Sequence, residues 1–310
     1  MIYDHRDQRF RGQLQGKIVV TGAAGFVGSH LMHTLPAGVA LGIVNNNHPD
    51  DDRHYLALDL LQPHALDVLR ELRPRMILHT AAISAIQNSE ADKARAWHLN
   101  AEVPVRLAQL SVELRCRFIH LSTDMVFDGL DGDYTEEDTP NPINYYGRSK
   151  LAAEQGIAEV NPEAVIARLA LVYGFPVREG RGVSFLQWIF QQVAANRPVP
   201  LFSDEWRTPV EVKQLCAALV ALADSPACGI FHLAGAEKLN RVRMGEVICR
   251  AFGFPEELLQ PMTRHQANLH TSRPRDLSMR CSRLNAQLNR AMLSGFSERI
   301  AHLAGKAPAG

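Results

Sequence analysis

The sequence predicts an α/β protein built on a doubly wound parallel sheet, with a smaller α/β domain towards the C-terminus. Three observations carry this prediction. Short apolar segments alternate with amphipathic helical segments up to residue 172, a glycine-rich turn follows the first apolar segment, and the alternation loosens after Tyr173. Parallel strands joined by helices need cover on both faces of the sheet, and doubly wound folds provide it.

The apolar segments predict six strands, at residues 17–21, 39–44, 55–58, 76–79, 118–121 and 164–167. The amphipathic segments between them predict helices at 26–35, 63–72, 90–114 and 145–159. Pro36 and Gly38 end the first helix, whereas Pro104 falls inside the third.

The pattern beyond residue 172 predicts a second, interleaved domain. Residues 174–182 look like a Gly/Arg-rich loop, helices are expected at 183–196 and 210–223, and a short strand is expected within 198–209. A strand near 229–234 could rejoin the main sheet, and helices and Arg-rich loops should follow from about 240. Since domains average ~150 residues, we expect an extension at 1–15, a main domain at 16–172 and a smaller one at 173–310.

The composition argues against several classes of partner. Lys and Arg total 33, as do Asp and Glu, so the formal net charge is zero. Nucleic-acid binders and polybasic membrane anchors carry a basic excess, so neither partner is expected. Five scattered cysteines without C-x-x-C spacing favour free thiols in a reducing compartment. No apolar run reaches the ~18 residues of a membrane span, and the polar leader lacks a secretion signal. We therefore expect a cytoplasmic protein with a loose leader at residues 1–15.

The glycine turn is typical of a dinucleotide site. Residues 21–28 read TGAAGFVG, with Gly22, Gly25 and Gly28 spaced as G-x-x-G-x-x-G between a strand and a helix. Glycines let the backbone approach a pyrophosphate, and the helix N-terminus offers free N–H groups. We therefore interpret 16–172 as an NAD(P)-binding Rossmann domain, with Phe26 and Val27 also at the cofactor.

The end of the second strand indicates which nicotinamide cofactor is used. NAD sites normally place an acidic residue there, on the ribose 2′-hydroxyl, but this chain has Asn45, and its first acid downstream is Asp50. A pocket near Asn45, His48 or Arg53 that tolerates a 2′-phosphate is the functional interpretation; a polar surface loop is the alternative. We favour NADP(H) and leave NAD(H) open.

A Y-x-x-x-K motif provides the catalytic candidates. Tyr146 and Lys150 are four residues apart, so a helix presents both on one face. Tyrosine has a pKa near ~10 and needs help to exchange a proton at neutral pH. Tyr145 is a competitor at the wrong spacing. Thr123 follows a strand, at the sheet edge where such folds bind ligands, although it could simply cap a turn.

These features, in this chain order, resemble the extended short-chain dehydrogenase/reductases. The segments STDMVFDG, NPINYYGRSKLAAE, EWRTPV and GIFHLAGAE are similar to the dTDP-4-dehydrorhamnose reductase branch, which also includes a non-catalytic regulatory subunit of methionine adenosyltransferase. The resemblance runs from Gly16 to about Leu293.

The resemblance implies a role for each matched residue. Thr123 would bind the substrate carbonyl, Tyr146 would protonate it, and Lys150 would lower the tyrosine pKa and hold the nicotinamide ribose. Asn100 would be a structural or proton-relay residue. Further cofactor contacts would come from Asp59, Leu60, Ala81 and Ala82.

Two departures from the branch concern the substrate. Rhamnose-forming reductases usually carry tyrosine at Met125 and tryptophan at Leu171, so dTDP-4-dehydrorhamnose itself is in doubt. Dehydratases of the superfamily carry Thr-Asp-Glu, and their glutamate acts as the general base. Here Met125 follows Thr123 and Asp124 in its place, and a thioether cannot take a proton, which argues against dehydration.

The substrate side is expected to contain arginines, because guanidinium groups pair well with phosphates. Thr123, Asp124, Met125 and Arg207 are the predicted substrate contacts; Arg178, Arg181, Arg273 and Arg275 are weaker candidates. Trp188 and Trp206 look more like packing residues, and no histidine spacing indicates a metal site.

The sequence therefore predicts an NAD(P)H-dependent carbonyl reductase, with a nucleotide-linked 4-keto-6-deoxysugar as the best substrate. The alternatives are reduction of a non-sugar ketone, an epimerase, or a cofactor-binding regulatory subunit. A homodimer is left open.

Overall fold

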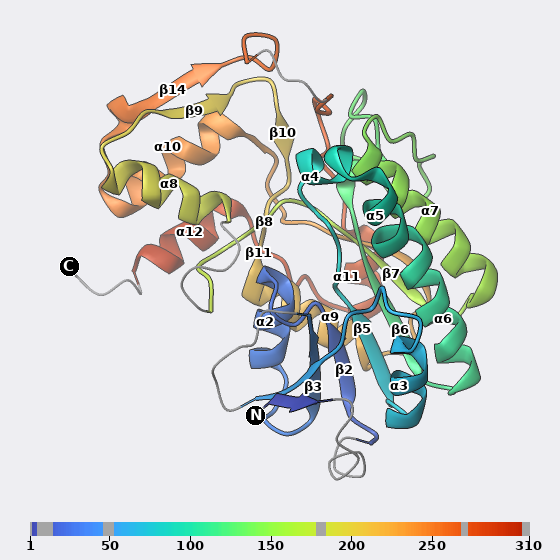
Figure 1. The fold of residues 1–310 in the computed structure, drawn as a ribbon. Helices are drawn as coiled ribbons and strands as arrows, with labels where there is room; N and C mark the ends of the chain where they lie inside the picture. The colour runs from blue at the N-terminus through green and yellow to red at the C-terminus, as the bar shows by residue number, and fades with distance from the viewer. Residues whose placement is uncertain (1, 5–14, 46–52, 178–183, 268–271, 306–310) are drawn as a thin grey trace.

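Among the described residues, the central feature of the computed structural model is one parallel sheet of eight strands (Figure 1), in the order β1-β4-β3-β2-β5-β6-β7-β12, with β1 (Ile2–Asp4) and β12 (Gly229–Leu233) at its edges. The structure describes residues 2–4, 15–45, 53–177, 184–267 and 272–305. The inner strands are β2 (Ile18–Thr21), β3 (Ala40–Val44), β4 (His54–Ala57), β5 (Met76–His79), β6 (Arg117–Thr123) and β7 (Val165–Leu169). The strand order reverses between β2 and β5, and doubly wound sheets bind ligands at the carboxyl edge of such a point.

Helices cover both faces of this sheet. One face carries α2 (Phe26–Thr34), α9 (Val212–Ala223) and α11 (Ser282–Leu288); the other carries α3 (Ala65–Leu72), α6 (Val103–Glu113) and α7 (Tyr145–Val160). Leu31 and Leu215 share the first core, and Leu107 and Ala153 share the second. Full burial of a leucine contributes about 1.5–3 kcal/mol, so these two layers hold the sheet in place.

The predicted strand near 229–234 does rejoin the sheet. β12 (Gly229–Leu233) pairs in parallel with β7, from Gly229 opposite Val165 to Leu233 opposite Leu169. The chain reaches β12 only after leaving the sheet for a second lobe and returning through α9, which packs against α2.

The second lobe lies at the upper left of Figure 1 and has its own core. It contains α8 (Phe185–Ala194), β9 (Val199–Phe202), α10 (Arg241–Phe252), β14 (Leu259–Met262) and α12 (Phe296–Ala304). Short strand pairs connect it to the sheet lobe: β8 (Val172–Tyr173) with β11 (Val210–Glu211), and β10 (Trp206–Arg207) with β13 (Leu239–Asn240). The sequence did not indicate β14, because Pro261 interrupts its pattern. The division at residue 172 stays a prediction.

The helical stretch predicted at 90–114 is confirmed from Lys93 to Glu113, but it breaks at Asp92 and is not a uniform α-helix. The chain instead forms α4 (Ile86–Ala91), α5 (Lys93–Trp97), a π-helical turn (His98–Glu102) and then α6. Asp92 leaves the helical conformation, with φ −132° and ψ 78°, and its side chain caps α5 by accepting the N–H of Arg95. Pro104 has no N–H to donate to the carbonyl four residues earlier, and the wider π turn lies where that hydrogen bond is missing.

The expectation of a loose leader also needs correction. Residues Ile2–Asp4 form β1, which pairs in parallel with β4. An uncovered β4 would present unpaired N–H and C=O groups along its edge, and backbone pairing with β1 satisfies them. The rest of the predicted leader up to residue 14 lies outside the described residues.

Candidate active site

The glycine turn lies where β2 passes into α2. Gly25 is the N-cap of α2, no side chain of the described residues caps this helix, and its first turn has no acidic residue, so its N–H groups remain available to an anion. A Cβ on Gly22 would lie 2.7 Å from Ala81 Cα, and one on Gly28 would lie 2.3 Å from the Gly22 oxygen. A Cβ on Gly25 would meet only the Gly22 oxygen, at 3.1 Å. Gly22 and Gly28 therefore permit close packing, whereas Gly25 leaves space beside the helix end, and the turn fits a dinucleotide.

The loop after β5 brings two predicted cofactor residues to this turn. Ala81 and Ala82 are half-buried, and the Ala81 N–H donates to Thr21 Oγ1 at 3.3 Å. Phe26 and Val27 pack against the core below the turn. All of them lie at the carboxyl edge of the sheet.

The remaining predicted cofactor residues follow β3 and β4. Asn45 is exposed directly after β3, and Asp59 and Leu60 are half-buried after β4. One carboxylate oxygen of Asp59 accepts the Leu61 N–H at 3.0 Å, so it also stabilises a turn. His48 lies outside the described residues. These assignments stay predictions.

Thr123 and Tyr146 meet because α7 begins against the end of β6. Asn144 caps α7 by accepting the Gly147 N–H at 2.8 Å. A Cβ on Gly147 would lie 2.1 Å from the Met125 oxygen, so only glycine lets this helix turn approach so closely. Thr123 Oγ1 donates to Asp124 at 3.1 Å and accepts the Met125 N–H at 3.2 Å. Thr123 therefore caps its turn and also faces Tyr146.

Tyr146 is buried and carries a raised pKa. Burial raises the pKa of its hydroxyl to about 12; a hydrogen bond with Thr123 acts in the opposite direction, and the charge of Asp124 adds to the rise. The tyrosine is thus protonated across the physiological range, which suits a proton donor. Here burial rather than Lys150 governs its pKa.

Lys150 lies one helical turn from Tyr146 and is almost completely enclosed. Its Nζ lies 2.8 Å from His120 Nε2. Burial lowers the pKa of Lys150 to about 7, against the charge of Glu154, which raises it. Among the described residues, the Lys150 ammonium therefore has a neutral histidine and no carboxylate as its hydrogen-bond partner.

Tyr145, the competing tyrosine, points elsewhere. Its ring lies 6.3 Å from the Trp97 ring, and Lys93 Nζ lies 5.5 Å from its centroid. Tyr145 therefore faces α5, and Tyr146 is the tyrosine beside Thr123.

Asn100 lies in the π-helical turn and has a clear structural role. Its side chain accepts the Ile83 N–H at 2.9 Å and donates to the Ile83 carbonyl at 3.1 Å and to Ser149 Oγ at 3.2 Å. These bonds join the loop after β5 to α7. Asn100 thus positions the cofactor-side loop relative to Tyr146, and a proton-relay role stays a prediction.

A buried ionic cluster links Thr123 to the second lobe. Asp124 Oδ2 lies 3.8 Å from Arg207 Nε, and Arg207 Nη2 lies 3.3 Å from Glu205. Burial raises the pKa of Asp124 to about 6 against the pull of Arg207. Arg207 is only 1% exposed, so its contacts are those of a structural cation, and its predicted contact with substrate stays a prediction.

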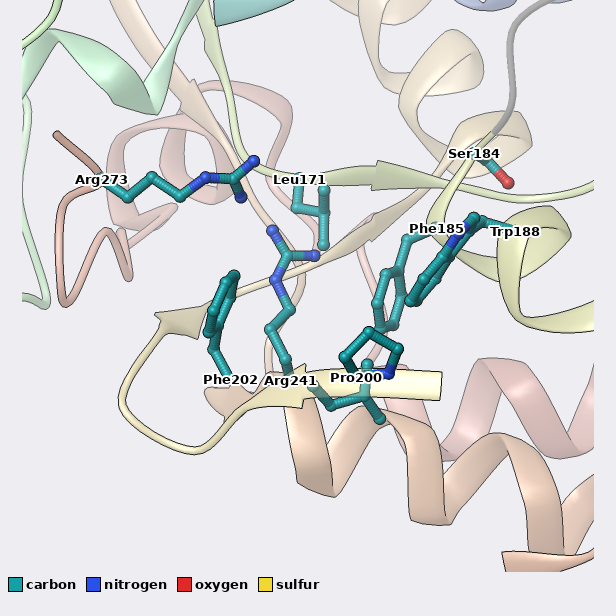
Figure 2. Close-up of a pocket in the computed structure, with 9 residues that line it drawn as sticks. Leu171, Ser184, Phe185, Trp188, Pro200, Phe202, Arg241 and Arg273 are labelled. Atoms are coloured by element: carbon teal, nitrogen blue, oxygen red, sulfur yellow. The ribbon is translucent and has the colours of Figure 1, made fainter. Parts of the chain in front are cut away.

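Two further arginines extend this cluster into a cavity of about 430 Å³. Arg241 Nη2 lies 2.8 Å and Arg273 Nη1 lies 3.6 Å from Glu205. Burial alone would raise the pKa of Glu205, but the charges of Arg241, Arg207 and Arg273 hold it at about 2. Figure 2 shows both cavity guanidinium groups approaching the same space beside Leu171.

Aromatic rings support these two arginines. Arg241 lies 4.9 Å from the Phe185 centroid and Arg273 lies 5.7 Å from that of Phe202. Trp188 also lines the cavity rather than only packing. Arg178 and Arg181 lie outside the described residues.

Sequence reasoning missed several of these residues. Arg241, Glu205, Glu154 and His120 were not identified as site residues, and only the identity of Glu205 within the EWRTPV segment offered a signal. Met125, one of the predicted substrate residues, is half-buried and receives a weak 3.8 Å hydrogen bond from Asn144 Nδ2 at its sulfur. Within the described residues, no group of three or more His, Cys, Asp or Glu is arranged to hold a metal ion.

Comparisons with known proteins place these features in context. The family model described as RmlD substrate binding domain matches residues 16–305. A probable low-salt glycan biosynthesis reductase of Haloferax volcanii is 32% identical over 87% of this chain and 91% of its own length. The dTDP-4-dehydrorhamnose reductase of Mycobacterium tuberculosis is 30% identical over 81% and 80%. Methionine adenosyltransferase 2 subunit beta of Danio rerio is 31% identical over 86% and 84%.

Solved structures agree on the fold. A hypothetical dTDP-4-dehydrorhamnose reductase from Sulfolobus tokodaii has a TM-score of 0.79 at 27% identity, covering 89% of this chain and 96% of its own. A dTDP-4-dehydrorhamnose reductase from Bacillus anthracis, in complex with NADP, has a TM-score of 0.83 at 21% identity, covering 94% and 100%. Within the described residues, no helix is both long and apolar enough to cross a membrane.

Proposed function

The chain belongs to the RmlD substrate binding domain family of extended short-chain dehydrogenase/reductases, and from this premise we propose that it is an NAD(P)H-dependent reductase of a nucleotide-linked sugar ketone. The observation that carries the proposal is the meeting of Thr123, Tyr146 and Lys150 at the same edge of the sheet as the glycine turn, with β5 between them. Two relatives of similar length are named as reductases, which agrees with this chemistry.

The residues of this chain divide the work of the reaction. Gly22, Gly25 and the α2 N-terminus would hold the dinucleotide pyrophosphate, and Lys150 its nicotinamide ribose. The bound cofactor supplies a hydride to the carbonyl carbon. Thr123 orients the carbonyl oxygen, and Tyr146 gives that oxygen its proton, so the ketone becomes a secondary alcohol. The raised pKa of Tyr146 keeps it protonated until negative charge develops on the oxygen.

The arginine-lined cavity favours an anionic substrate. Three guanidinium groups face the carboxylates of Glu205 and Asp124, which leaves one positive charge in excess. A diphosphate can use Arg241 and Arg273 in paired hydrogen bonds. The best candidate is a nucleotide-linked 4-keto-6-deoxysugar. Because Met125 and Leu171 replace aromatic residues of the rhamnose-forming branch, we expect poor turnover of dTDP-4-dehydrorhamnose itself.

NADPH is the favoured cofactor because exposed Asn45, not a carboxylate, follows β3. We expect NADPH to bind more tightly than NADH, and Asn45→Asp to weaken NADPH binding about tenfold, which is ~1.4 kcal/mol, because a carboxylate repels the 2′-phosphate. Calorimetric titration of both cofactors measures this. Tighter NADH binding by the wild type would reject the NADPH preference.

A cofactor-binding subunit without catalysis is the second candidate, favoured by the similarity to methionine adenosyltransferase 2 subunit beta. The two are separated by incubating the protein with NADPH and a panel of nucleotide-linked keto-sugars, and following loss of reduced cofactor. Reduction of any member supports the enzyme. Cofactor binding with no reduction, together with altered activity of a partner enzyme, supports the subunit.

The remaining expectations concern assembly and location. We also propose that the protein forms a homodimer and is located in the cytoplasm. Sedimentation of the purified protein and fractionation of its native cells test them.

A further inference from the structure

A column of buried polar side chains crosses the sheet from the glycine turn to Lys150. Thr21 on β2, His79 on β5 and His120 on β6 stand opposite one another in the strand register. All three are 0% exposed. The two imidazole rings stack with centroids 5.2 Å apart, and His120 Nε2 lies 2.8 Å from Lys150 Nζ. The column therefore joins the cofactor-side turn to the catalytic lysine.

The hydrogen bonds at the Thr21 end determine the form of His79. Thr21 Oγ1 accepts the N–H groups of Thr80 and Ala81, at 3.2 and 3.3 Å. Its own proton is left to point at His79 Nδ1, which lies 2.7 Å away. His79 Nδ1 is therefore an acceptor, and a neutral His79 carries its proton on Nε2.

The Lys150 end determines the form of His120 by the same reasoning. Below its pKa of about 7, Lys150 is an ammonium that can only donate, so His120 Nε2 accepts and the His120 proton is on Nδ1. Within the described residues, His120 Nδ1 and His79 Nε2 have no hydrogen-bond partner. A core built only for packing would avoid two unpaired buried donors, because each of them lowers stability.

We propose that His120, braced by His79, is a positioning residue that keeps the Lys150 ammonium charged and aimed towards the cofactor ribose. This rests on the proposed function, because it assigns Lys150 to the ribose. Neutral imidazole accepts a hydrogen bond without neutralising the charge, so the ammonium still has two donors for ligand oxygens. A carboxylate at this position would compete with the ligand for the lysine.

The other groups near Lys150 allow this role. Glu154 lies on the same helix, but its carboxylate is held by two bonds from Arg168 Nε at 3.1 Å and by Ser122. Tyr146 is protonated, and the Asp124 carboxylate contacts Thr123 and Arg207. Burial lowers the pKa of His79 to about 3 and that of His120 well below its usual range, so both rings stay neutral.

The first test measures NADPH affinity against pH by calorimetry, which requires no substrate. In the wild type, affinity should fall as pH rises through the pKa of Lys150. His120→Leu removes the acceptor, so this fall should move about one pH unit lower, and NADPH should bind about tenfold more weakly at pH 7. His120→Gln keeps an acceptor near the Nε2 position, so it should restore most of the NADPH affinity at pH 7 and most of the pH at which that affinity falls.

The matched control is His232→Leu, because His232 on β12 is equally buried but bonds to the Tyr134 carbonyl instead. It should lower the melting temperature without moving the pH profile. If His120→Leu keeps the wild-type profile, or if His232→Leu moves it equally, the positioning role is overturned.

The second test uses the cofactor-free wild type and therefore separates this inference from the proposed function. Nitrogen-15 NMR of labelled histidines at pH 6, assigned with His79→Gln and His120→Gln, reports the tautomers. Protonation at Nδ1 of His120 and at Nε2 of His79 is expected. A cationic His120, or one protonated at Nε2, overturns the inference. If the wild type binds neither NADPH nor NADH, the proposed function fails and these tautomers alone decide whether His120 holds Lys150.

Discussion

Lys150 and Arg207 are two cations that the fold buries equally, each 1% exposed, but in different ways. Lys150 faces a neutral histidine, whereas Arg207 lies between Asp124 and Glu205. Burial without a directly paired carboxylate brings the pKa of Lys150 to about 7. In the arginine cluster, burial still lowers the pKa of Arg207 and raises that of Asp124, but at Glu205 the guanidinium charges outweigh burial and the pKa falls to about 2.

The difference teaches how to tell a reactive site from a structural one among buried charges. A buried charge without a partner costs stability and gains from an incoming ligand, while a compensated charge stabilises what is already there. The catalytic corner of Thr123, Tyr146 and Lys150 should therefore respond to the cofactor, and Glu205, which three arginines surround, should matter mainly for folding stability.

The largest effect is expected from Tyr146→Phe, in the catalytic corner. Phenylalanine keeps the ring and removes the proton donor, so single-turnover hydride transfer should slow by about 10²–10⁴-fold. NADPH affinity should change little. Tyr145→Phe is the matched control, because that ring faces Trp97, and its rate should stay within about twofold. Wild-type turnover by Tyr146→Phe would show that the proposed acid is wrong.

Glu205→Gln should have the next largest effect, on stability. It leaves three arginines around a neutral amide, and the free energy of unfolding should fall by about 3–5 kcal/mol. Because the folded pKa of Glu205 is depressed, its contribution is present above pH ~4.5 and is lost as pH falls towards 2. In urea titrations, the free energy of unfolding should therefore change less between pH 7 and pH 3 for the variant than for the wild type.

The control for that substitution is Glu256→Gln, which removes an exposed pair with Arg250 at 3.1 Å. Exposed pairs contribute less than about 1 kcal/mol. If Glu205→Gln and Glu256→Gln lowered the free energy of unfolding equally, the buried arginine cluster would not depend on the charge of Glu205 for its stability.

Lys150→Met should do the reverse of Glu205→Gln and stabilise the cofactor-free protein. The folded pKa of Lys150 is about 7 against 10.5 when unfolded, so its charge penalises folding fully below pH 7 and not at all above pH ~10.5. At pH 6 the variant should gain about 0.5–2 kcal/mol, and the gain should shrink by pH 10. If Lys150→Met were less stable than the wild type at pH 6, the buried charge of Lys150 would not oppose folding, and its difference from Arg207 would be contradicted.

The smallest effect is expected from Leu171→Trp, at the cavity that the arginines share. An aromatic face contributes roughly 0.5–1.5 kcal/mol of stacking, so turnover of dTDP-4-dehydrorhamnose should rise about threefold to tenfold. Steady-state kinetics with that substrate measure it. Fast turnover by the wild type would remove the case for a different sugar.

The parts of the site set by local spacing could be predicted from sequence. Tyr146 and Lys150 are a helical turn apart, and the glycine turn joins a strand to a helix, so each could be interpreted without tertiary information. The family resemblance added Thr123, whose contact with the substrate stays a prediction. Asn100 was identified, but its bonds to Ile83 depend on a π turn that the pattern did not indicate.

The rest depended on register and on contacts between distant segments. His79 and His120 face each other only because β5 and β6 pair in that register. Arg241 and Glu205 are distant in sequence, and the two meet through the second lobe. Pro104 indicated an irregularity in the predicted 90–114 helix, but the sequence did not indicate which helical turn would become a π turn. Such facts follow from packing rather than from periodicity.

The return of the chain through α9 and β12 has a consequence for how the protein is made. On the ribosome, the glycine turn, β6 and α7 emerge well before residue 233, yet until then α2 lacks its partner helix α9 and β7, already paired with β6, lacks its second neighbour β12. The nascent chain must carry an uncovered apolar sheet face while the intervening second-lobe segments are synthesised, and such faces attract chaperones or aggregate. A fragment ending at residue 172 should consequently be insoluble, although it contains all three catalytic side chains.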